Sequence, residues 1–334
     1  MVRPPRAPDY TNVKDAKELL DLIGQTVHAK VHTASKKYFD ELHGDLSKAT
    51  FSSEETASSI ETCYLVKEYY NNHVNGGDSD KRHPCKKDGT GKEVARFSDK
   101  EGAECDNSKI HGNIKGRNGT DVGACAPYRR LSLCNRNLVK MDTNNYSKAK
   151  HDLLAEVCLA AKFEGESIKT HYPQYQAQYP GSASTTCTVL ARSFADIGDI
   201  IRGRDLYGGG GRGKGKEKLE GKLKDIFAKI YNEVTSGKNR LALKDRYNDE
   251  SGNYYQLRED WWTANRHTVW KAITCGTHEG DTYFRPTCSN RQGPSQANHY
   301  CRCNGDKPDD DKVNIDPPTY FDYVPQYLRW FDEY

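Results

Sequence analysis

Apolar residues recur at three- and four-residue steps in five stretches of the chain, the spacing expected for one buried face of an α-helix. The predicted helices cover residues 14–47, 147–170, 185–207, 216–235 and 256–275. Four of them follow one another between residues 147 and 275, with short connections. This pattern predicts a helical bundle in the second half of the chain. A further short helix is predicted to begin near Pro325.

The other segments lack this periodicity. Residues 49–62 are rich in Ser, Thr and Glu and are predicted to form a loop, and residues 71–80 are typical of a linker. Residues 81–140 hold four cysteines among glycine, asparagine, lysine and aspartate: Cys85, Cys105, Cys125 and Cys134. A segment this polar cannot build its own apolar core, so we expect covalent cross-links to stabilise it.

Within the bundle, the helix over 185–207 has a clear apolar stripe that contains Phe194, Ile197 and Ile200. The pattern predicts that this stripe is buried and that Asp196, Asp199 and Arg202 face outward: polar positions between the apolar ones lie on the opposite helix face. The three tryptophans of the last bundle helix are predicted to be core residues: Trp261, Trp262 and Trp270.

Composition narrows the class of protein. Of 334 residues, 35% are apolar and 29% are charged, so the chain is too polar to form one large apolar core. Aromatic residues make up 10% of the chain, which argues against disorder. Eleven cysteines indicate an oxidising, extracellular compartment, because cytosolic thiols are kept reduced. No stretch is apolar over the ~18 residues of a membrane helix, so we expect any membrane attachment to come from a segment outside this chain.

The net charge is only +3, but it is unevenly distributed. Residues 81–140 hold 14 basic and 7 acidic side chains, and residues 202–244 hold 12 and 5. Both ends are acidic: residues 1–80 hold 9 basic and 13 acidic side chains, and residues 305–334 hold 3 and 8. Two basic blocks between acidic ends indicate an anionic partner. The small total charge and the extracellular setting argue against nucleic acid.

The glycine-rich segment Gly208–Lys214 fits the spacing of a phosphate-binding loop, G-x-x-x-x-G-K. The next residue is Gly215 rather than the Ser or Thr that binds magnesium, and a helix rather than a strand is predicted to precede the segment. We therefore interpret it as a surface loop and expect no cofactor.

Cys288, Cys301 and Cys303 lie near His278 and His299, which leaves a zinc site or disulfides as alternatives. The C-x-C spacing is a weak zinc signal and the cysteine density favours disulfides, so we predict no metal. The G-x-S-x-G and H-E-x-x-H patterns are both missing from the sequence. We expect no catalytic site and no enzyme activity.

The second basic block contains a run that is denser than an ordinary solvated helix face: Arg202, Arg204, Arg212, Lys214, Lys216, Lys218, Lys222 and Lys224. It is either a solvated face or a binding site for sulfated or sialylated glycans, because closely spaced cations release counterions when they meet a polyanion. The next candidates lie in the first basic block: Arg129, Arg130, Lys86 and Lys87.

Five motifs, in this order, resemble those of a known family: Ala124–Leu131 with Cys134, Val157–Gly165, Ala195–Gly203, Trp262–Cys275 and Tyr323–Trp330. They are similar to the alpha class of Duffy-binding-like domains. With residues 1–78 in front, the chain resembles the N-terminal head region of the falciparum erythrocyte membrane protein 1 family, the variant malarial surface adhesins. The resemblance covers essentially the whole chain.

The resemblance implies a mainly α fold with four parts. Residues 1–78 would be a helical N-terminal segment, 79–145 an irregular disulfide-rich subdomain, 146–275 a helical-bundle subdomain, and 276–334 the incomplete start of a third subdomain. It also implies the disulfides Cys85–Cys134, Cys105–Cys125 and Cys187–Cys275, with Cys63–Cys158 as a further guess. Cys301 and Cys303 would then need partners in the rest of the third subdomain.

The resemblance implies, finally, an adhesion module on the surface of the infected erythrocyte. Its expected partners are erythrocyte glycans (heparan-sulfate-like chains and blood-group sugars) in rosetting, complement receptor, and host antibodies. The alternative is a structural and antigenic head domain, with receptor binding carried by a neighbouring domain.

Overall fold

The computed structural model describes most of the chain: residues 11, 13, 15–49, 61–74, 82–86, 92–93, 95–97, 105–145, 148–180, 184–208, 214–237, 239–283, 285–290, 293–312, 315–331 and 333. The α-helices are α1 (Ala16–Ser35), α2 (Phe39–Leu42), α3 (Thr62–Tyr69), α5 (Tyr128–Leu131), α6 (Arg136–Lys140), α7 (Ala149–Gln178), α8 (Thr186–Arg202), α9 (Lys214–Thr235), α10 (Arg240–Tyr247), α11 (Tyr255–Ile273) and α12 (Gln326–Phe331).

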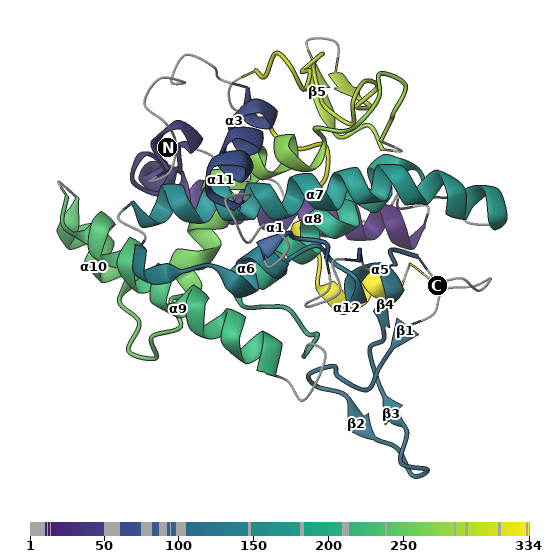
Figure 1. The fold of residues 1–334 in the computed structure, drawn as a ribbon, viewed down its shortest axis with the longest axis horizontal. Coiled ribbons are helices and arrows are strands. Elements are labelled where there is room, and N and C mark those ends of the chain that lie inside the picture. The colour runs from purple at the N-terminus through teal and green to yellow at the C-terminus, as the bar shows by residue number, and fades with distance from the viewer. Residues whose placement is uncertain are drawn as a thin grey trace.

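Short elements complete the fold. The 3₁₀ turns are η1 (Lys36–Tyr38), η2 (Leu46–Lys48), η5 (Thr143–Asn145) and η6 (Phe321–Tyr323), and η4 (Tyr70–Val74) is a π-helical turn. The described residues contain three antiparallel strand pairs: β1 (Cys105–Asp106) with β4 (Ala126–Pro127), β2 (Ile114–Lys115) with β3 (Asp121–Val122), and β5 (Cys288–Asn290) with β6 (Gly293–Ser295). The β2–β3 hairpin projects away from the helices (Figure 1).

The helices α7, α8 and α11 pack against one another and form the centre of the molecule (Figure 1). Trp261 and Trp262 are fully buried there and Trp270 is nearly so, which confirms the predicted core role of all three. The four predicted bundle helices correspond to α7, α8, α9 and α11. Sequence periodicity found these helices because each buries a regular apolar stripe against its neighbours.

The predicted helix over 14–47 is divided in the structure. Helix α1 ends at Ser35, and η1, α2 and η2 follow it. Asp15 caps the start of α1 by accepting a hydrogen bond from the Glu18 backbone N–H at 2.7 Å. The segment packs along α11 and η6, and each break lets buried residues such as Tyr38 and Leu42 turn toward the core.

Close contact between α7 and α11 depends on Gly165. A Cβ atom added at Gly165 would lie 1.9 Å from the carbonyl oxygen of Ile273. We expect Gly165→Ala to lower the free energy of unfolding by roughly 1–3 kcal/mol, because one helix must move to relieve the overlap. Urea unfolding followed by tryptophan fluorescence measures this change.

Gly221 in α9 is the matched control, because a Cβ atom there would meet nothing within 4 Å. Gly221→Ala should instead raise stability by about 0.5–1 kcal/mol, the usual gain from replacing glycine inside a helix. Equal effects of the two substitutions would contradict the proposed packing constraint at Gly165.

Five disulfides cross-link the chain. Cys85–Cys134 and Cys105–Cys125 confirm the pairing expected for the polar segment. The other three are Cys63–Cys275, Cys187–Cys301 and Cys288–Cys303. The zinc alternative is thereby replaced by disulfides, as predicted. Cys301 and Cys303 are bonded within this chain, so the expectation that they need partners beyond it is wrong.

The predicted pairs Cys187–Cys275 and Cys63–Cys158 are also wrong. Helix α3 packs on both α7 and α11, which places the Cα atoms of Cys63 and Cys275 5.6 Å apart, within disulfide reach. Cys187 at the start of α8 pairs instead with Cys301. The backbone carbonyl of Cys301 also accepts a hydrogen bond from the Trp270 indole at 2.9 Å. Only packing between distant segments decides between such alternatives.

Cys158 is the free cysteine, and it is fully buried in α7. Burial raises the pKa of its thiol well above the ordinary value, because a thiolate there would lose its hydration. This side chain therefore acts as a small apolar core residue.

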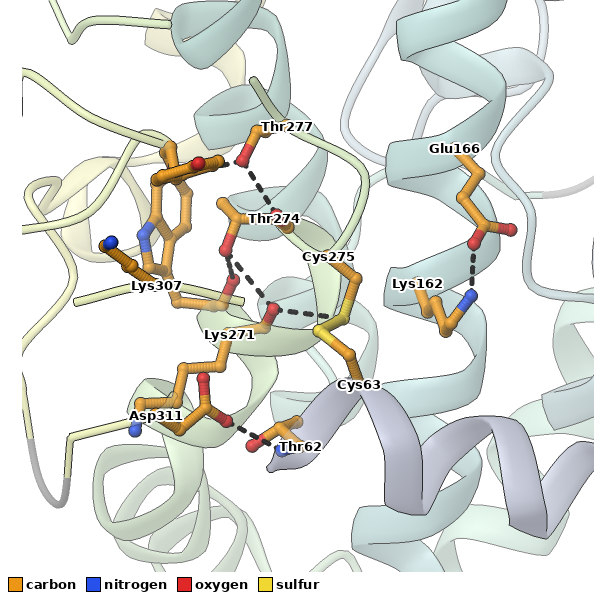
Figure 2. Close-up of a disulfide and its surroundings, with 12 residues drawn as sticks. Thr62, Cys63, Lys162, Glu166, Lys271, Thr274, Cys275, Thr277, Lys307 and Asp311 are labelled. Carbon is orange, nitrogen blue, oxygen red and sulfur yellow. Dashed lines mark hydrogen bonds and ion pairs between the residues drawn. A yellow bond between two sulfur atoms is a disulfide. The ribbon is translucent and has the colours of Figure 1, made fainter. Parts of the chain in front are cut away.

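Figure 2 shows the surroundings of the Cys63–Cys275 disulfide. Beside Cys63, the Thr62 backbone N–H donates a hydrogen bond to the Asp311 carboxylate at 2.7 Å. Beside Cys275, the Thr277 hydroxyl donates to the Thr274 carbonyl at 2.8 Å. The disulfide and these hydrogen bonds join α3, the end of α11 and the loop around Asp311 at one place.

Candidate anion-binding surface

Helix α8 is buried on all sides, which changes the interpretation of its charged residues. Asp196, Asp199 and Arg202 are 0%, 3% and 1% exposed, so the prediction that they face outward is wrong. Helices α7 and α11 cover one side of α8, and η6 and α12 pack against it as well. Sequence periodicity marked the apolar stripe correctly but gave no sign that the polar stripe is also covered.

The buried carboxylates of α8 bind a group of arginines. Asp196 accepts hydrogen bonds from Arg129 at 2.7 Å, from Arg329 at 2.8 Å and from the Gln326 amide at 3.0 Å. Arg129 also pairs with Glu333 at 2.7 Å. Burial alone would raise the pKa of Asp196, but the surrounding guanidinium groups outweigh it and hold this pKa well below its usual range.

A second buried group joins α11 to the chain around η6. Asp322 accepts two hydrogen bonds from Arg266, at 2.8 and 2.9 Å, and one from the Trp262 indole at 2.8 Å. Arg202 binds Asp199 at 2.9 Å and also donates to the Asp322 carbonyl. These contacts use the donors of Arg202 inside the protein, so Arg202 is no surface residue.

The candidates Arg129 and Arg130 are also buried. Arg130 pairs with Asp205 at 2.6 Å, so both arginines of this motif serve the interior of the fold. Lys86 is half-buried, while Lys87 and Arg212 lie outside the described residues. Lys214 begins α9, but its side chain is not among those that the structure describes.

The lysines of α9 fall into different environments. Lys222 donates to the Met141 carbonyl, and Lys216 donates to the Asp205 carbonyl at 2.7 Å. Lys224 is half-buried and lines a cavity, whereas Lys218 is exposed. Arg204, which follows α8, keeps 56% of its side chain exposed while pairing with Glu259 at 2.7 Å. Of the described candidates, Arg204 and Lys218 are therefore the exposed ones.

Another exposed set of cations was missed by the sequence analysis: Lys36, Lys37, Arg240 and Lys244. Tyr38 of the N-terminal segment lies against Tyr247 of α10, with ring centroids 6.0 Å apart, and Arg246 lies over the Tyr38 ring at 5.3 Å. The fold thus brings η1 beside α10, although about 200 residues separate them. The basic count over 202–244 included Arg240 and Lys244, but the predicted run stopped at Lys224.

Two further features are absent from the described part of the chain. Among the described residues, no group of three or more His, Cys, Asp or Glu side chains could hold a metal ion. In the same part of the chain, no helix has the length and apolar character needed to cross a membrane.

Comparison with known proteins gives a consistent result. A family model described as Duffy binding domain matches residues 123–329, and one described as N-terminal segments of PfEMP1 matches residues 15–50. No curated protein sequence matches the chain.

Solved structures of PfEMP1 domains resemble nearly the whole chain. The double domain NTS-DBL1-alpha and CIDR-gamma of PfEMP1, from the Plasmodium falciparum varO strain, is 33% identical with a TM-score of 0.69; the match covers 96% of this chain and 43% of that one. The varO NTS-DBL1(alpha-1) domain is 31% identical with a TM-score of 0.63, covering 96% and 60%.

A PfEMP1 DBLbeta domain, solved bound to ICAM-1, is 28% identical with a TM-score of 0.63; the match covers 94% of this chain and 67% of that one. The chain thus spans less than two thirds of the first two structures.

Proposed function

Since the chain belongs to the Duffy-binding domain family and carries an N-terminal segment of the PfEMP1 type, we propose that it is a host-cell adhesion module of a variant surface antigen, displayed on infected erythrocytes. The observation that carries this proposal is the order of the two matched regions, N-terminal segment and then domain. The same arrangement is present in the varO double domain, whose match covers 96% of this chain. A related DBLbeta domain bound to ICAM-1 supports receptor binding as the general class of activity.

The proposed ligands are erythrocyte glycans with sulfate or carboxylate groups, of the heparan-sulfate-like and blood-group types, with complement receptor and host antibodies as further partners. The proposed binding residues are two sets of exposed cations: Arg204 and Lys218 in one, and Lys36, Lys37, Arg240 and Lys244 in the other. Each exposed ion pair contributes little to the free energy of binding. Affinity therefore comes from many contacts and many displayed copies.

Reversing exposed lysines tests this ligand class. We expect K36E/K37E and K218E each to elute from a heparin column at lower salt than the unmodified protein, because each loses cations that release counterions. K67E is the control, since Lys67 is an exposed lysine on α3 that belongs to neither set. Retention that does not depend on ionic strength, or equal loss in K67E, would contradict the electrostatic mechanism.

The second proposed function is a structural and antigenic head domain with receptor binding on a neighbouring domain. It is favoured by the burial of Arg129, Arg130 and Arg202, which removes three candidate cations from the surface. Binding of this chain alone to uninfected red cells separates the two proposals. Adhesion by the isolated chain supports the first, and adhesion that requires a longer protein supports the second.

We also propose the division into an N-terminal segment (1–78), a disulfide-rich subdomain (79–145), a helical bundle (146–275) and the start of a third subdomain (276–334). Two of the disulfides join different parts of this division: Cys63–Cys275 links the first to the third, and Cys187–Cys301 links the third to the fourth. We therefore expect these parts to unfold together. Coincident urea transitions by circular dichroism and tryptophan fluorescence would support this, and separated transitions would contradict it.

A further inference from the structure

A cavity of about 470 Å³ lies between α9 and the segments around α6, the end of α8 and the start of α11. Its volume falls within the ~300–1,000 Å³ of typical small-molecule sites. One face of α9 forms a wall of it, through Lys216, Leu219, Glu220, Leu223 and Lys224. These residues are three or four apart in sequence, so they line up along one side of the helix.

The apolar part of the lining is mainly aliphatic, with the rings of Tyr207 and Tyr255 beside it. Six Leu, Ile and Val side chains contribute to it: Leu131, Leu133, Val139, Ile200, Leu219 and Leu223. They come from both the polar disulfide-held segment and the bundle. Because the six aliphatic side chains outnumber the two tyrosines, this wall favours a hydrocarbon chain, whose burial is driven by loss of apolar surface from water.

The charged part of the lining has an excess of positive charge. Both carboxylates are already bound by guanidinium groups: Asp205 by Arg130 at 2.6 Å, and Glu220 by Arg258 at 2.6 Å. Within the described residues, no ion pair involves the ammonium group of Lys216 or Lys224. Two amines beside a mainly aliphatic wall, neither within ion-pair distance of a carboxylate among the described residues, are the complement of an anionic head group on an apolar chain.

The two amines have different roles. Lys216 already donates to the Asp205 carbonyl at 2.7 Å, and burial lowers its pKa. Lys224 lies eight residues further along α9, about 12 Å along the helix axis, and has no hydrogen bond among those of the described residues. Lys224 is therefore the residue available to bind a head group, while Lys216 adds favourable charge at the other end of the cavity.

We propose that this cavity binds a single-chain anionic amphiphile, a carboxylate or sulfate carried on an aliphatic chain of medium length. The head group accepts hydrogen bonds from Lys224, and the chain lies along Leu219, Leu223 and Ile200. This binding site is separate from the exposed cations assigned to adhesion. It does not depend on the adhesion proposal.

Titration calorimetry with monomeric decanoate tests the site, with decanol as the uncharged comparison. Decanoate should bind with a saturable isotherm near one site per chain, and decanol more weakly. K224Q should weaken decanoate binding about tenfold or more, as expected for loss of a charged hydrogen bond. K218Q is the matched control: it removes the same charge from an exposed position of the same helix and should leave the affinity unchanged.

A second variant tests the apolar wall. V139F adds volume at a half-buried lining position and should abolish decanoate binding while heparin retention stays unchanged. The proposal is overturned if decanoate does not saturate, if decanol binds as well as decanoate, or if K224Q and K218Q lose affinity equally. It is also overturned if V139F, folded by circular dichroism, binds decanoate normally.

Discussion

Removing the Cys63–Cys275 disulfide, by replacing both cysteines with serine, is expected to lower the free energy of unfolding by up to about 5 kcal/mol. The two residues are 212 positions apart, and in the chain-entropy model a bond that closes so long a loop strongly restricts the unfolded chain. The Cys187–Cys301 bond overlaps this loop and already restricts part of it, which makes about 5 kcal/mol an upper value.

The C63S/C275S variant is measured by urea unfolding under non-reducing conditions. C105S/C125S is the matched comparison, because that bond spans only 20 residues and is expected to contribute about 3 kcal/mol. The order of the two losses is the critical result. A larger loss for the shorter loop would show that loop entropy does not control the stabilisation of this protein by its disulfides.

Replacing Asp196 with alanine is expected to lower the free energy of unfolding by about 3–5 kcal/mol, the usual result of breaking a buried ion pair. Asp196 is fully buried and binds Arg129 and Arg329. Without its carboxylate, these two guanidinium groups keep one carboxylate partner each, Glu333 and Asp199, and part of their positive charge stays buried without compensation.

The acid dependence of this effect has a defined sign. The pKa of Asp196 is lowered in the folded protein. The contribution of this carboxylate to the free energy of unfolding is therefore complete above the ordinary aspartate pKa of about 3.9, and it is lost as the pH falls below that value. The stability difference between the unmodified protein and D196A should therefore be constant near neutral pH and shrink in strong acid. Thermal unfolding at a series of pH values measures it.

D225A is the control for D196A, because Asp225 is an exposed carboxylate on α9. Its removal should change stability by no more than about 0.5 kcal/mol. A loss below about 1 kcal/mol in D196A would mean that the arginines around Asp196 are compensated by other groups. In that case the buried network would not be a main stabilising feature.

The large number of buried arginines changes how the basic blocks are interpreted. Five arginines are each at most 5% exposed and pair with carboxylates: Arg96, Arg129, Arg202, Arg258 and Arg266. A chain with only 35% apolar residues thus builds much of its interior from ion pairs and hydrogen bonds. Positive charge along the sequence therefore overestimates positive charge on the surface.

The sequence alone determined the helices of the bundle and the three core tryptophans. Each of these follows from a local pattern: apolar side chains three and four apart must share one helix face, and that face must be buried. The five motifs likewise identified the family, since their residues and order can be compared without knowledge of contacts. The resemblance to this family also implied the pairs Cys85–Cys134 and Cys105–Cys125, and the structure contains both.

Tertiary structure alone decided which side chains meet across long distances in the chain. Cys63 pairs with Cys275 because α3 packs on α11, and Arg202 is an interior residue because η6 and α12 cover the second side of α8. The same holds for Lys224, which differs from exposed Lys218 only in the segments that face it. A residue's own neighbours in sequence set the face it occupies, but the free energy of burying that face depends on which distant segment covers it.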